Sequence, residues 1–293
     1  MAHRRTALVT GATHGIGYEV SRRLAHQDTF VIVHGPTPGE AHAAVDRLIR
    51  DGADPHRLEP VAADYARMGD VLSLAQAITR RHERLDLLIN NAGVAVHPAA
   101  FQINYLAHYA LTRLLAPSLT AAGGRVVSVT SALHREGTLA FDQTGRAGYA
   151  NAKLALTMFT RALRVIAEDR IRACAVHPGT IGTGSFDVFY GRGGLPVADG
   201  AAAVLGAGDG FYYEGFLRAD AAPPVYDDAS LRHLWRSSAR LLGWDYAATK
   251  SAANGSANGS ANGSANGSAN GSANGSANGS ANGSAKNAVK PAA

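Results

Sequence analysis

The segment Thr10-Gly11-Ala12-Thr13-His14-Gly15-Ile16-Gly17 directly follows a short apolar run and opens an amphipathic stretch over residues 17–25. Gly11 can allow a tight turn, Gly15 a close approach of the backbone to a ligand, and Gly17 close contact between helix and strand. The start of such a helix offers free N–H groups and a positive dipole end to a pyrophosphate. The spacing Gly-x-x-x-Gly-x-Gly differs from the more familiar Gly-x-Gly-x-x-Gly, but its place between strand and helix predicts a nucleotide site.

The same alternation of short apolar runs and amphipathic stretches continues along the chain. Strands are expected at residues 7–10, 30–33, 58–62, 87–90, 125–130, 172–176 and 210–213, and helices at 17–25, 40–51, 70–83, 104–119 and 149–168. Short apolar strands that are each followed by a helix indicate a parallel sheet covered on both faces. Right-handed crossovers then favour an α/β fold with one Rossmann-type doubly wound sheet of about seven strands. In such a sheet the ligand crevice opens at the carboxyl ends of the strands, which is where the polar motifs of this chain fall.

The C-terminal part of the chain has a different composition. The tetrapeptide Ala-Asn-Gly-Ser repeats eight times over residues 253–284 of the 293-residue chain. It contains no apolar residue larger than alanine, so it cannot bury enough surface to offset the entropy of ordering. A helical repeat array is the alternative, but four residues are far shorter than any solenoid unit. We expect one folded domain over residues 1–249 and a disordered tail over residues 250–293.

Charge and cysteine content limit which partners the protein can bind and in which cellular compartment it is expected. The net charge is +5, and the arginines are scattered along the chain, which argues against a nucleic-acid-binding stripe. The single cysteine, Cys174, excludes a disulfide within the chain and favours a reducing compartment. We find neither a signal peptide nor a stretch of ~20 apolar residues, so a cytoplasmic protein without a membrane span is expected. The twelve histidines are dispersed without ligand-like spacing, and no metal is expected.

A second motif, Tyr149-Ala-Asn-Ala-Lys153, places a phenol and an ammonium on one helix face. A free phenol, with a pKa of about 10, is a poor base at neutral pH, and a nearby cation favours the phenolate. Alone, this pair would be an ordinary solvated helix start; beside a nucleotide site it predicts an acid/base pair. Alternation puts Ser128 and Thr130 on one face of their strand and leaves Ser131 at its exit. Ser131 is therefore the hydroxyl that we expect to act beside Tyr149 and Lys153.

Taken together, these motifs resemble the classical short-chain dehydrogenase/reductase family. The resemblance covers residues 6 to about 245, and the segments at 101–108, 149–155, 176–179 and 231–235 look most like its retinol-dehydrogenase-like branch. It is carried, in chain order, by Thr10-Gly-x-x-x-Gly-Ile-Gly17, Asn90-Asn-Ala-Gly93, Asn104, Ser131, Tyr149-x-x-x-Lys153 and Pro178-Gly179. The resemblance implies that residues 1–249 form an NAD(P)-binding catalytic domain. Trp235, in an expected C-terminal helix, is interpreted as a core residue.

The resemblance also implies a role for each catalytic residue. Tyr149 would act as general acid in reduction and as general base in oxidation. Lys153 would lower the pKa of that phenol and bind the nicotinamide ribose, Ser131 would donate to the substrate oxygen, and Asn104 would hold a water that links Lys153 to solvent. The residues expected to bind the cofactor are Gly11, Thr13, His14, Gly15, Ile16, Gly17, His34, Asp64, Asn91, Ala92, Gly93, Tyr149, Lys153, Pro178, Gly179, Ile181 and Thr183.

Two of these cofactor assignments carry alternatives. The Asp64 carboxylate would accept a hydrogen bond from the adenine amino group, or else it caps a helix. Gly35 stands where NAD-users of the family commonly carry an acidic residue, and Pro36 stands where NADP-users often carry arginine. His14 and His34 could compensate in part for that arginine. We predict that NADP(H) is preferred over NAD(H).

The predicted function is NADP(H)-dependent interconversion of a ketone or aldehyde and an alcohol. The loop over residues 132–148 and the glycine-rich, aromatic segment over residues 184–194 would cover an apolar substrate. His134 and His177 flank the site, where they either contact substrate or pack. Two alternatives stay open: a non-catalytic dinucleotide-binding regulatory protein, and a protein whose tail is the functional part. A homo-oligomer is compatible with the sequence.

Overall fold

The computed structural model describes residues 4–166, 171–182, 188–189, 191 and 193–244. All of these lie in one compact unit, Met1–Lys250. The predicted tail over residues 250–293 lies outside the described residues, and so does most of the predicted lid over residues 184–194.

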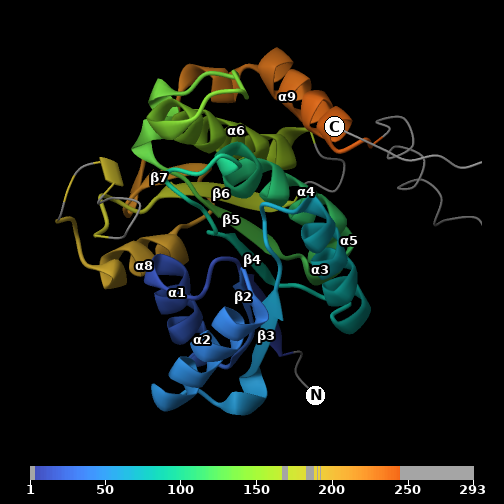
Figure 1. Ribbon diagram of the computed structural model, residues 1–293, viewed down its shortest axis with the longest axis vertical. Helices are drawn as coiled ribbons and strands as arrows, with labels where there is room; N and C mark the ends of the chain where they lie inside the picture. Colours follow the sequence, from blue (N-terminus) through green and yellow to red (C-terminus); the bar gives the residue numbers. More distant parts are fainter. Residues whose placement is uncertain (1–3, 167–170, 183–187, 190, 192, 245–293) are drawn as a thin grey trace, which may run out of the picture. The chain divides into compact units, whose positions relative to one another are not determined.

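A twisted sheet runs through the middle of the described part of the chain (Figure 1). Its eight strands have the order β3-β2-β1-β4-β5-β6-β7-β8, and the first seven are parallel, while β8 pairs antiparallel with β7. The chain reverses its direction of travel across the sheet between β1 and β4, the point at which doubly wound sheets bind ligands. The strands are β1 (Arg5–Val9), β2 (Thr29–Gly35), β3 (Leu58–Ala62), β4 (Leu87–Asn90), β5 (Arg125–Val129), β6 (Arg172–His177), β7 (Tyr212–Glu214) and β8 (Leu217–Arg218).

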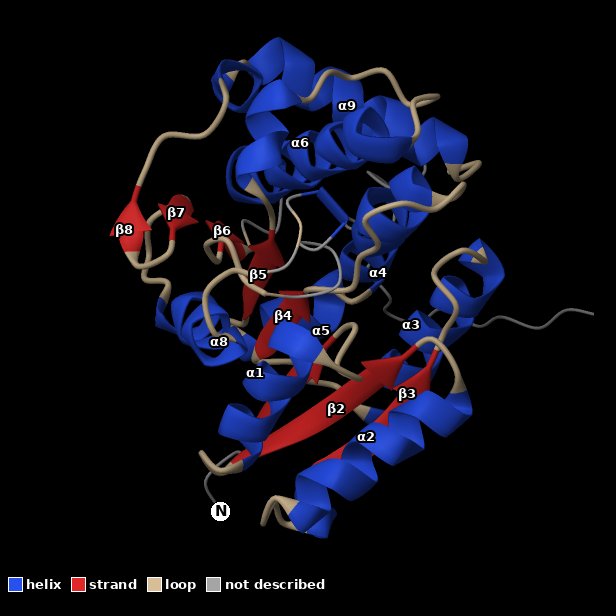
Figure 2. Ribbon diagram, turned by 60° about the vertical axis from the view of Figure 1, so that its left-hand side comes forward, coloured by secondary structure: helices blue, strands red, loops and turns tan. Residues whose placement is uncertain are grey.

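Helices cover both faces of this sheet (Figure 2). On one face lie α1 (Gly15–Ala25), α2 (Pro38–Arg50) and α8 (Val197–Gly206). On the other lie α3 (Met68–Arg81), α4 (Ala107–Leu114), α5 (Ala116–Ala122), α6 (Gly145–Val165) and α9 (Asp228–Leu241).

Successive strand residues feed two separate hydrophobic cores. In β1, Ala7 and Val9 pack with α1, α2 and α8, whereas Leu8 between them packs with the helices of the opposite face. All three are fully buried. Because side chains alternate along a strand, a strand covered on both faces must be apolar throughout, as these runs are. The prediction of an α/β doubly wound parallel sheet is confirmed, with one more short strand than expected.

The element boundaries show where local sequence signals were sufficient. The strands expected at residues 58–62 and 87–90 have those bounds. The helix expected at residues 104–119 is instead a π-helical turn over Gln102–Leu106, then α4 and α5. Pro117 lies at the start of α5, where its missing N–H and its ring prevent a continuous helix. Trp235 is buried in α9, so its interpretation as a core residue is confirmed.

The glycine turn allows α1 to lie against the end of the sheet. Gly11 has φ +62°, and a Cβ there would lie 2.7 Å from the Cα of Ala92. A Cβ on Gly17 would lie 2.3 Å from the carbonyl oxygen of Gly11 and 2.4 Å from Nδ2 of Asn91. These distances leave no room for a side chain, so the first turn of α1 depends on glycine at both positions.

Gly17→Ala should therefore destabilise the fold, by about 1–3 kcal/mol for an overpacked site. Gly39→Ala is the matched control, because Gly39 is also in the first turn of a helix and has no atom within 4 Å of a Cβ placed there. It should be neutral or stabilise by up to about 1 kcal/mol. Urea unfolding of both variants measures the difference, and equal stability of the two would refute the close contact.

Candidate functional site

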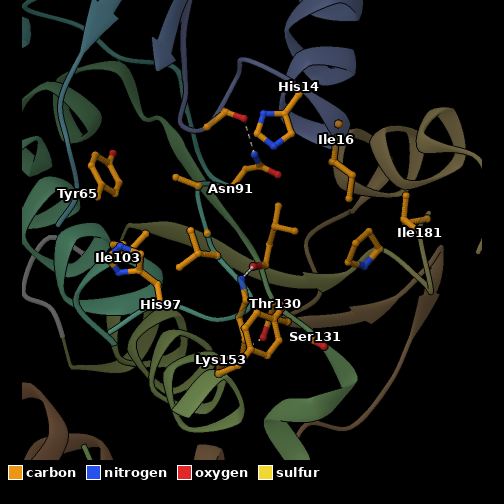
Figure 3. A pocket seen from close by; sticks show the side chains of 18 of the residues that line it. His14, Ile16, Tyr65, Asn91, His97, Ile103, Thr130, Ser131, Lys153 and Ile181 are labelled. Carbon is orange, nitrogen blue, oxygen red and sulfur yellow. Dashed lines mark hydrogen bonds between the residues drawn. The ribbon is translucent and has the colours of Figure 1, made fainter. Parts of the chain in front are cut away.

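A cavity of about 440 Å³ opens at the carboxyl ends of the parallel strands. Its lining comes from the segments that follow β1, β2, β3, β4, β5 and β6, together with the first turns of α6. In Figure 3, His14, Ile16 and Asn91 lie on one side of this cavity, and Thr130, Ser131 and Lys153 lie on the other. The two groups of residues singled out in the sequence thus face one space.

Most of the residues predicted for the site line this cavity. Gly17 does not, because it is used in the contact between α1 and the sheet, and Asn104 does not either. Thr183 lies outside the described residues. The predicted residues that do line the cavity are Gly11, Thr13, His14, Gly15, Ile16, His34, Asp64, Asn91, Ala92, Gly93, Ser131, Tyr149, Lys153, Pro178, Gly179 and Ile181.

Hydrogen bonds join the turn after β1 to the turn after β4. The hydroxyl of Thr10 accepts from the N–H groups of Asn91 (2.9 Å) and Ala92 (3.0 Å) and donates to the carbonyl of Ile89. The Asn91 amide donates in return to the carbonyls of Thr10 and Gly11, at 2.9 and 3.1 Å. The two loops at the chain reversal are therefore fixed to each other, which defines one wall of the cavity.

The position of His34 corrects part of the cofactor interpretation. Its Nδ1 accepts from the N–H of Gly11 at 3.1 Å, and its Nε2 donates to the carbonyl of Ala63 at 3.1 Å. The ring is 2% exposed, and this burial lowers the pKa of His34 to about 4. His34 is thus neutral near pH 7, so it cannot compensate for an arginine as a cation for a phosphate group. It ties the glycine turn to the end of β3.

Asp64 lies where the sequence placed it, but it does not cap a helix. The N-cap of α3 is Arg67. The Asp64 carboxylate accepts from the N–H of Ala66 at 2.9 Å and lies 3.5 Å from the guanidinium of Arg67. It therefore stabilises the turn after β3 while it lines the cavity, and the helix-cap alternative is wrong.

Asn104 holds the segment that follows β4. It lies in the π-helical turn, where its Oδ1 accepts from the N–H of Val94 (2.7 Å) and its Nδ2 donates to the carbonyl of Val94 (2.8 Å). A Cβ on Gly93 would lie 3.1 Å from that Oδ1 and 3.6 Å from Nζ of Lys153. Asn104 and Lys153 thus meet at Gly93. The water that Asn104 would hold to link Lys153 to solvent stays a prediction.

Tyr149 and Lys153 share one face of α6. The Lys153 ammonium lies 5.5 Å from the centroid of the Tyr149 ring and donates to the carbonyl of Val129 at 2.8 Å. Lys153 is only 4% exposed, and loss of hydration lowers its pKa to about 8. A cation is therefore held beside the phenol, in a place where it exchanges its proton within reach of neutral pH.

The exit of β5 presents Ser131 to the same space. The hydroxyls of Ser128 and Thr130 bond to those of Thr160 and Thr157 in α6, each at 2.8 Å, as expected for residues on one face of the strand. Ser131 caps the 3₁₀ turn Ala132–Glu136, and its Oγ accepts from the N–H of Leu133 at 3.3 Å. An acceptor role there leaves the hydroxyl proton of Ser131 available to a ligand.

Several lining residues were not found from the sequence. They were not named individually because they carry no motif of their own. They come from strands, helical turns and loops that meet only when the strand ends are brought together. The loop over residues 132–148 contributes Ala132 and Leu133, and the lid segment contributes Phe189, whose ring lies 5.1 Å from that of Tyr149. Pro36, which the sequence analysis considered for the choice of cofactor, also lines the cavity. The remaining lining residues that the sequence did not single out for the site are Glu40, Ala63, Tyr65, Val94, His97, Ile103, Val129, Thr130 and Thr180.

Two further observations concern metals and membranes. Within the described ranges, no three histidine, cysteine, aspartate or glutamate side chains gather in a way that could hold a metal ion. In the same part of the chain, no helix is both long enough and apolar enough to span a bilayer.

The fold and the site together define a class of protein. A doubly wound sheet with a glycine turn at its reversal point, and a cavity that also holds a phenol, an ammonium and a serine hydroxyl, is the arrangement of a nucleotide-dependent oxidoreductase. The family model of the short chain dehydrogenases matches residues 5–189. The chain belongs to this family, whose members bind NAD(P) and act on alcohol or carbonyl groups.

Similar proteins place the chain in the retinol-dehydrogenase-like branch. It is 29% identical over 283 residues to a polyprenol dehydrogenase of Danio rerio, covering 82% of this chain and 87% of that protein. It is 29% identical over 285 residues to retinol dehydrogenase 13 of Homo sapiens, covering 82% and 85%. A solved structure of an uncharacterised protein from Mycobacterium Paratuberculosis matches with TM-score 0.64 and 26% identity, covering 83% of this chain and 95% of that one. A 7α-hydroxysteroid dehydrogenase in complex with NADH shares the fold at TM-score 0.60 and 22% identity, over 72% of this chain and 93% of that one.

Buried histidines should make the fold sensitive to acid. Burial lowers the pKa of His108 to about 3 and that of His34 and His134 to about 4. Unfolding restores values near 6.5, so the unfolded chain binds more protons from about pH 6.5 down to about pH 4. Stability must therefore fall as pH falls through this window.

His108→Gln isolates one of these contributions. The glutamine amide can replace the bond from Nε2 of His108 to the carbonyl of Ala92 (2.8 Å) but does not titrate. The free energy of unfolding of the wild type should fall between pH 7 and pH 5, and in His108→Gln this fall should be smaller by about 2 kcal/mol. His56→Gln, at an exposed position, should leave that loss unchanged. Urea unfolding at both pH values measures it, and an equal loss in His108→Gln and the wild type would contradict a buried neutral ring.

Proposed function

We propose that this chain interconverts a ketone or aldehyde and an alcohol with NADP(H), and that Tyr149 transfers the proton. The observation that carries the proposal is that Tyr149, Lys153 and Ser131 line the same cavity as the glycine turn after β1. A protein that only sensed a dinucleotide would have no need of this acid/base set. The family is one of oxidoreductases, and no feature of the site favours the non-catalytic alternative.

The glycine turn and the start of α1 fit the pyrophosphate of a dinucleotide. Gly11 and Gly15 have positive φ, and His14, the N-cap of α1, makes no side-chain capping bond. The first N–H groups of α1 are thus not capped by that side chain, and the helix dipole favours an anion there. Asp64 and the segment from Asn91 to Gly93 would hold the adenosine end, and Pro178, Gly179 and Ile181 the nicotinamide end.

The bound nicotinamide would supply or accept a hydride. In reduction, Tyr149 gives its proton to the substrate oxygen while Ser131 donates a hydrogen bond to it. In oxidation, Tyr149 takes the proton back. The Lys153 ammonium next to the ring stabilises the phenolate in both directions. Since Lys153 has a pKa near 8, a bound anionic cofactor would favour its charged form.

The end of β2 supports NADP(H) over NAD(H). A Cβ on Gly35 would lie 2.8 Å from Cγ2 of Thr13 and 3.0 Å from the backbone nitrogen of Ala41. The acidic side chain that would bind the ribose 2′-OH of NAD therefore has no room at this position. Glu40 also lines the cavity, and its carboxylate would repel a 2′-phosphate, although the Thr37 hydroxyl donates to it at 2.6 Å and holds it at the start of α2. Since His34 is neutral, His14 is the remaining basic residue expected to contact a 2′-phosphate.

The substrate is proposed to be apolar. Val94, Ile103, Val129, Leu133 and Phe189 supply apolar lining to the cavity. The names of the similar proteins point the same way, since polyprenols and retinol are apolar alcohols. The cytoplasmic location, the homo-oligomer and the division of the chain at residue 250 stay predictions. Every residue given a role here in catalysis or in cofactor binding lies before residue 184.

Tyr149→Phe should leave cofactor binding nearly intact and lower kcat by about two to four orders of magnitude, as expected when a general acid is removed. Turnover is followed by the absorbance of the reduced nicotinamide with a panel of aldehydes, ketones and alcohols, and binding by fluorescence titration. Tyr226→Phe is the control, because the Tyr226 hydroxyl bonds to the N–H of Ala221 and does not line the cavity. Undiminished turnover in Tyr149→Phe would remove this residue from the mechanism.

NADPH should bind more tightly than NADH to the wild type, because the end of β2 has no room for a carboxylate at Gly35. His14→Asn should weaken NADPH binding severalfold while changing NADH binding little. His42→Asn, at an exposed position of α2, is the control. Fluorescence titration of the wild type and the two variants with both cofactors gives six Kd values, and tighter binding of NADH to the wild type would reverse the assignment.

A further inference from the structure

His134 follows the exit of β5 and has no part in the chemistry described above. It lies in the 3₁₀ turn that begins after Ser131, and its side chain is fully buried. It is not among the residues that line the cavity. Contact with substrate, one of the two roles expected from the sequence, therefore does not fit its position.

Both ring nitrogens of His134 bond to main-chain atoms that are far apart in the sequence. Nδ1 lies 2.8 Å from the carbonyl oxygen of Ser131, and Nε2 lies 3.0 Å from the backbone nitrogen of Ala222. A carbonyl can only accept, so Nδ1 carries the proton, and the N–H of Ala222 can only donate, so Nε2 is the acceptor. The partners thus fix one neutral tautomer.

The carbonyl of Ser131 receives two bonds from the same residue. The backbone N–H of His134 donates to it at 3.0 Å, in addition to the ring Nδ1–H. With its Oγ accepting from Leu133, Ser131 is held by main-chain and side-chain atoms of its own turn. Its hydroxyl direction therefore depends on the geometry of this turn.

The surrounding contacts anchor the ring at the edge of the sheet. The His134 ring packs on that of Tyr212 in β7, with centroids 5.1 Å apart. The next residue, Arg135, pairs with Glu214 of β7 and donates to the carbonyl of Asp220 at 2.6 Å. Residues 134 and 135 thus fasten the turn both to β7 and to the segment that leads into α9.

We propose that His134 is a positioning residue that sets the direction of the Ser131 hydroxyl through the hydrogen bond from its ring Nδ1 to the carbonyl of Ser131. The inference rests on the proposed function, in which Ser131 contacts the substrate oxygen. The bond that Nε2 accepts from Ala222 holds the segment before α9 to this ring and is not needed for the direction of the hydroxyl. A displacement of the order of 1 Å at such a site is enough to cost about 10²-fold in rate.

Two substitutions separate the two bonds. In His134→Asn, the amide nitrogen can take the place of Nδ1 and donate to Ser131, but nothing reaches Ala222. In His134→Gln, the amide oxygen can take the place of Nε2 and accept from Ala222, but the bond to Ser131 is lost. His233→Gln, at an exposed position of α9, is the control.

We expect kcat of His134→Asn to stay within about threefold of the wild type, while kcat of His134→Gln falls by about 10- to 100-fold at little change in the Kd of NADPH. Hydrogen exchange of the Ala222 amide should be fast in His134→Asn and protected in His134→Gln. The substrate is the apolar carbonyl compound turned over fastest in a panel of decanal, retinal and cyclohexanone. Equal kcat in the two variants, or kcat that follows Tm across the series, would show that His134 only packs.

Ser131→Ala distinguishes failure of this inference from failure of the proposed function. If Ser131→Ala keeps the turnover of the wild type, the role of Ser131 itself is wrong. If Ser131→Ala is slow but His134→Gln is not, only the positioning role of His134 is wrong. In the double variant, His134→Gln should lower kcat no further than Ser131→Ala alone, because it acts through the lost hydroxyl.

Discussion

The hydroxyl of Thr10 holds together the two loops on which the site depends. It accepts from two successive N–H groups after β4, and the amide of Asn91 returns two bonds to the carbonyls of the glycine turn. These loops lie at the point where the sheet changes its direction of winding, so without such cross-links they would diverge. The contact of Gly17 with Gly11 and Asn91 completes the arrangement and allows α1 to direct its N-terminus at the cavity. His34, which bonds to Gly11, and Gly93, which follows Ala92, are positioned by their attachment to these two loops.

Three buried histidines serve the carboxyl edge of the sheet in similar ways. His34 bonds to Gly11 and Ala63, His108 to Ala92, and His134 to Ser131 and Ala222. Each bonds to main-chain groups of the loops at this edge, and buried main-chain groups need such partners. A neutral imidazole suits this task because it can donate at one nitrogen and accept at the other. Burial keeps these rings neutral, so the rigidity of the site and its sensitivity to acid have the same origin.

The sequence predicted those features whose cause is local. The strands at Leu58–Ala62 and Leu87–Asn90, the two covered faces and the cavity lining by Tyr149, Lys153 and Ser131 follow from periodicity and short motifs. The tasks of His34 and Asn104 did not follow, because they depend on partners in other loops. The sequence shows a histidine near the end of the strand that became β2, but not that its two ring nitrogens bond to Gly11 and Ala63. By contrast, the break between α4 and α5 could have been predicted, because Pro117 is visible in the sequence. The prediction of one helix over residues 104–119 did not take it into account.

The crowding around Gly35 has a consequence for how this enzyme could change its coenzyme during evolution or in the laboratory. If the proposed preference for NADP(H) holds, a carboxylate at that point would be the shortest mutational path toward NAD, but any side chain there meets the methyl group of Thr13 and the backbone of α2. Thr13 can be replaced by a smaller residue, whereas the backbone at Ala41 can yield only if the whole helix moves. A switch of coenzyme therefore requires changes in both the glycine turn and α2. A single substitution at Gly35 would destabilise the protein before it could change the coenzyme that binds.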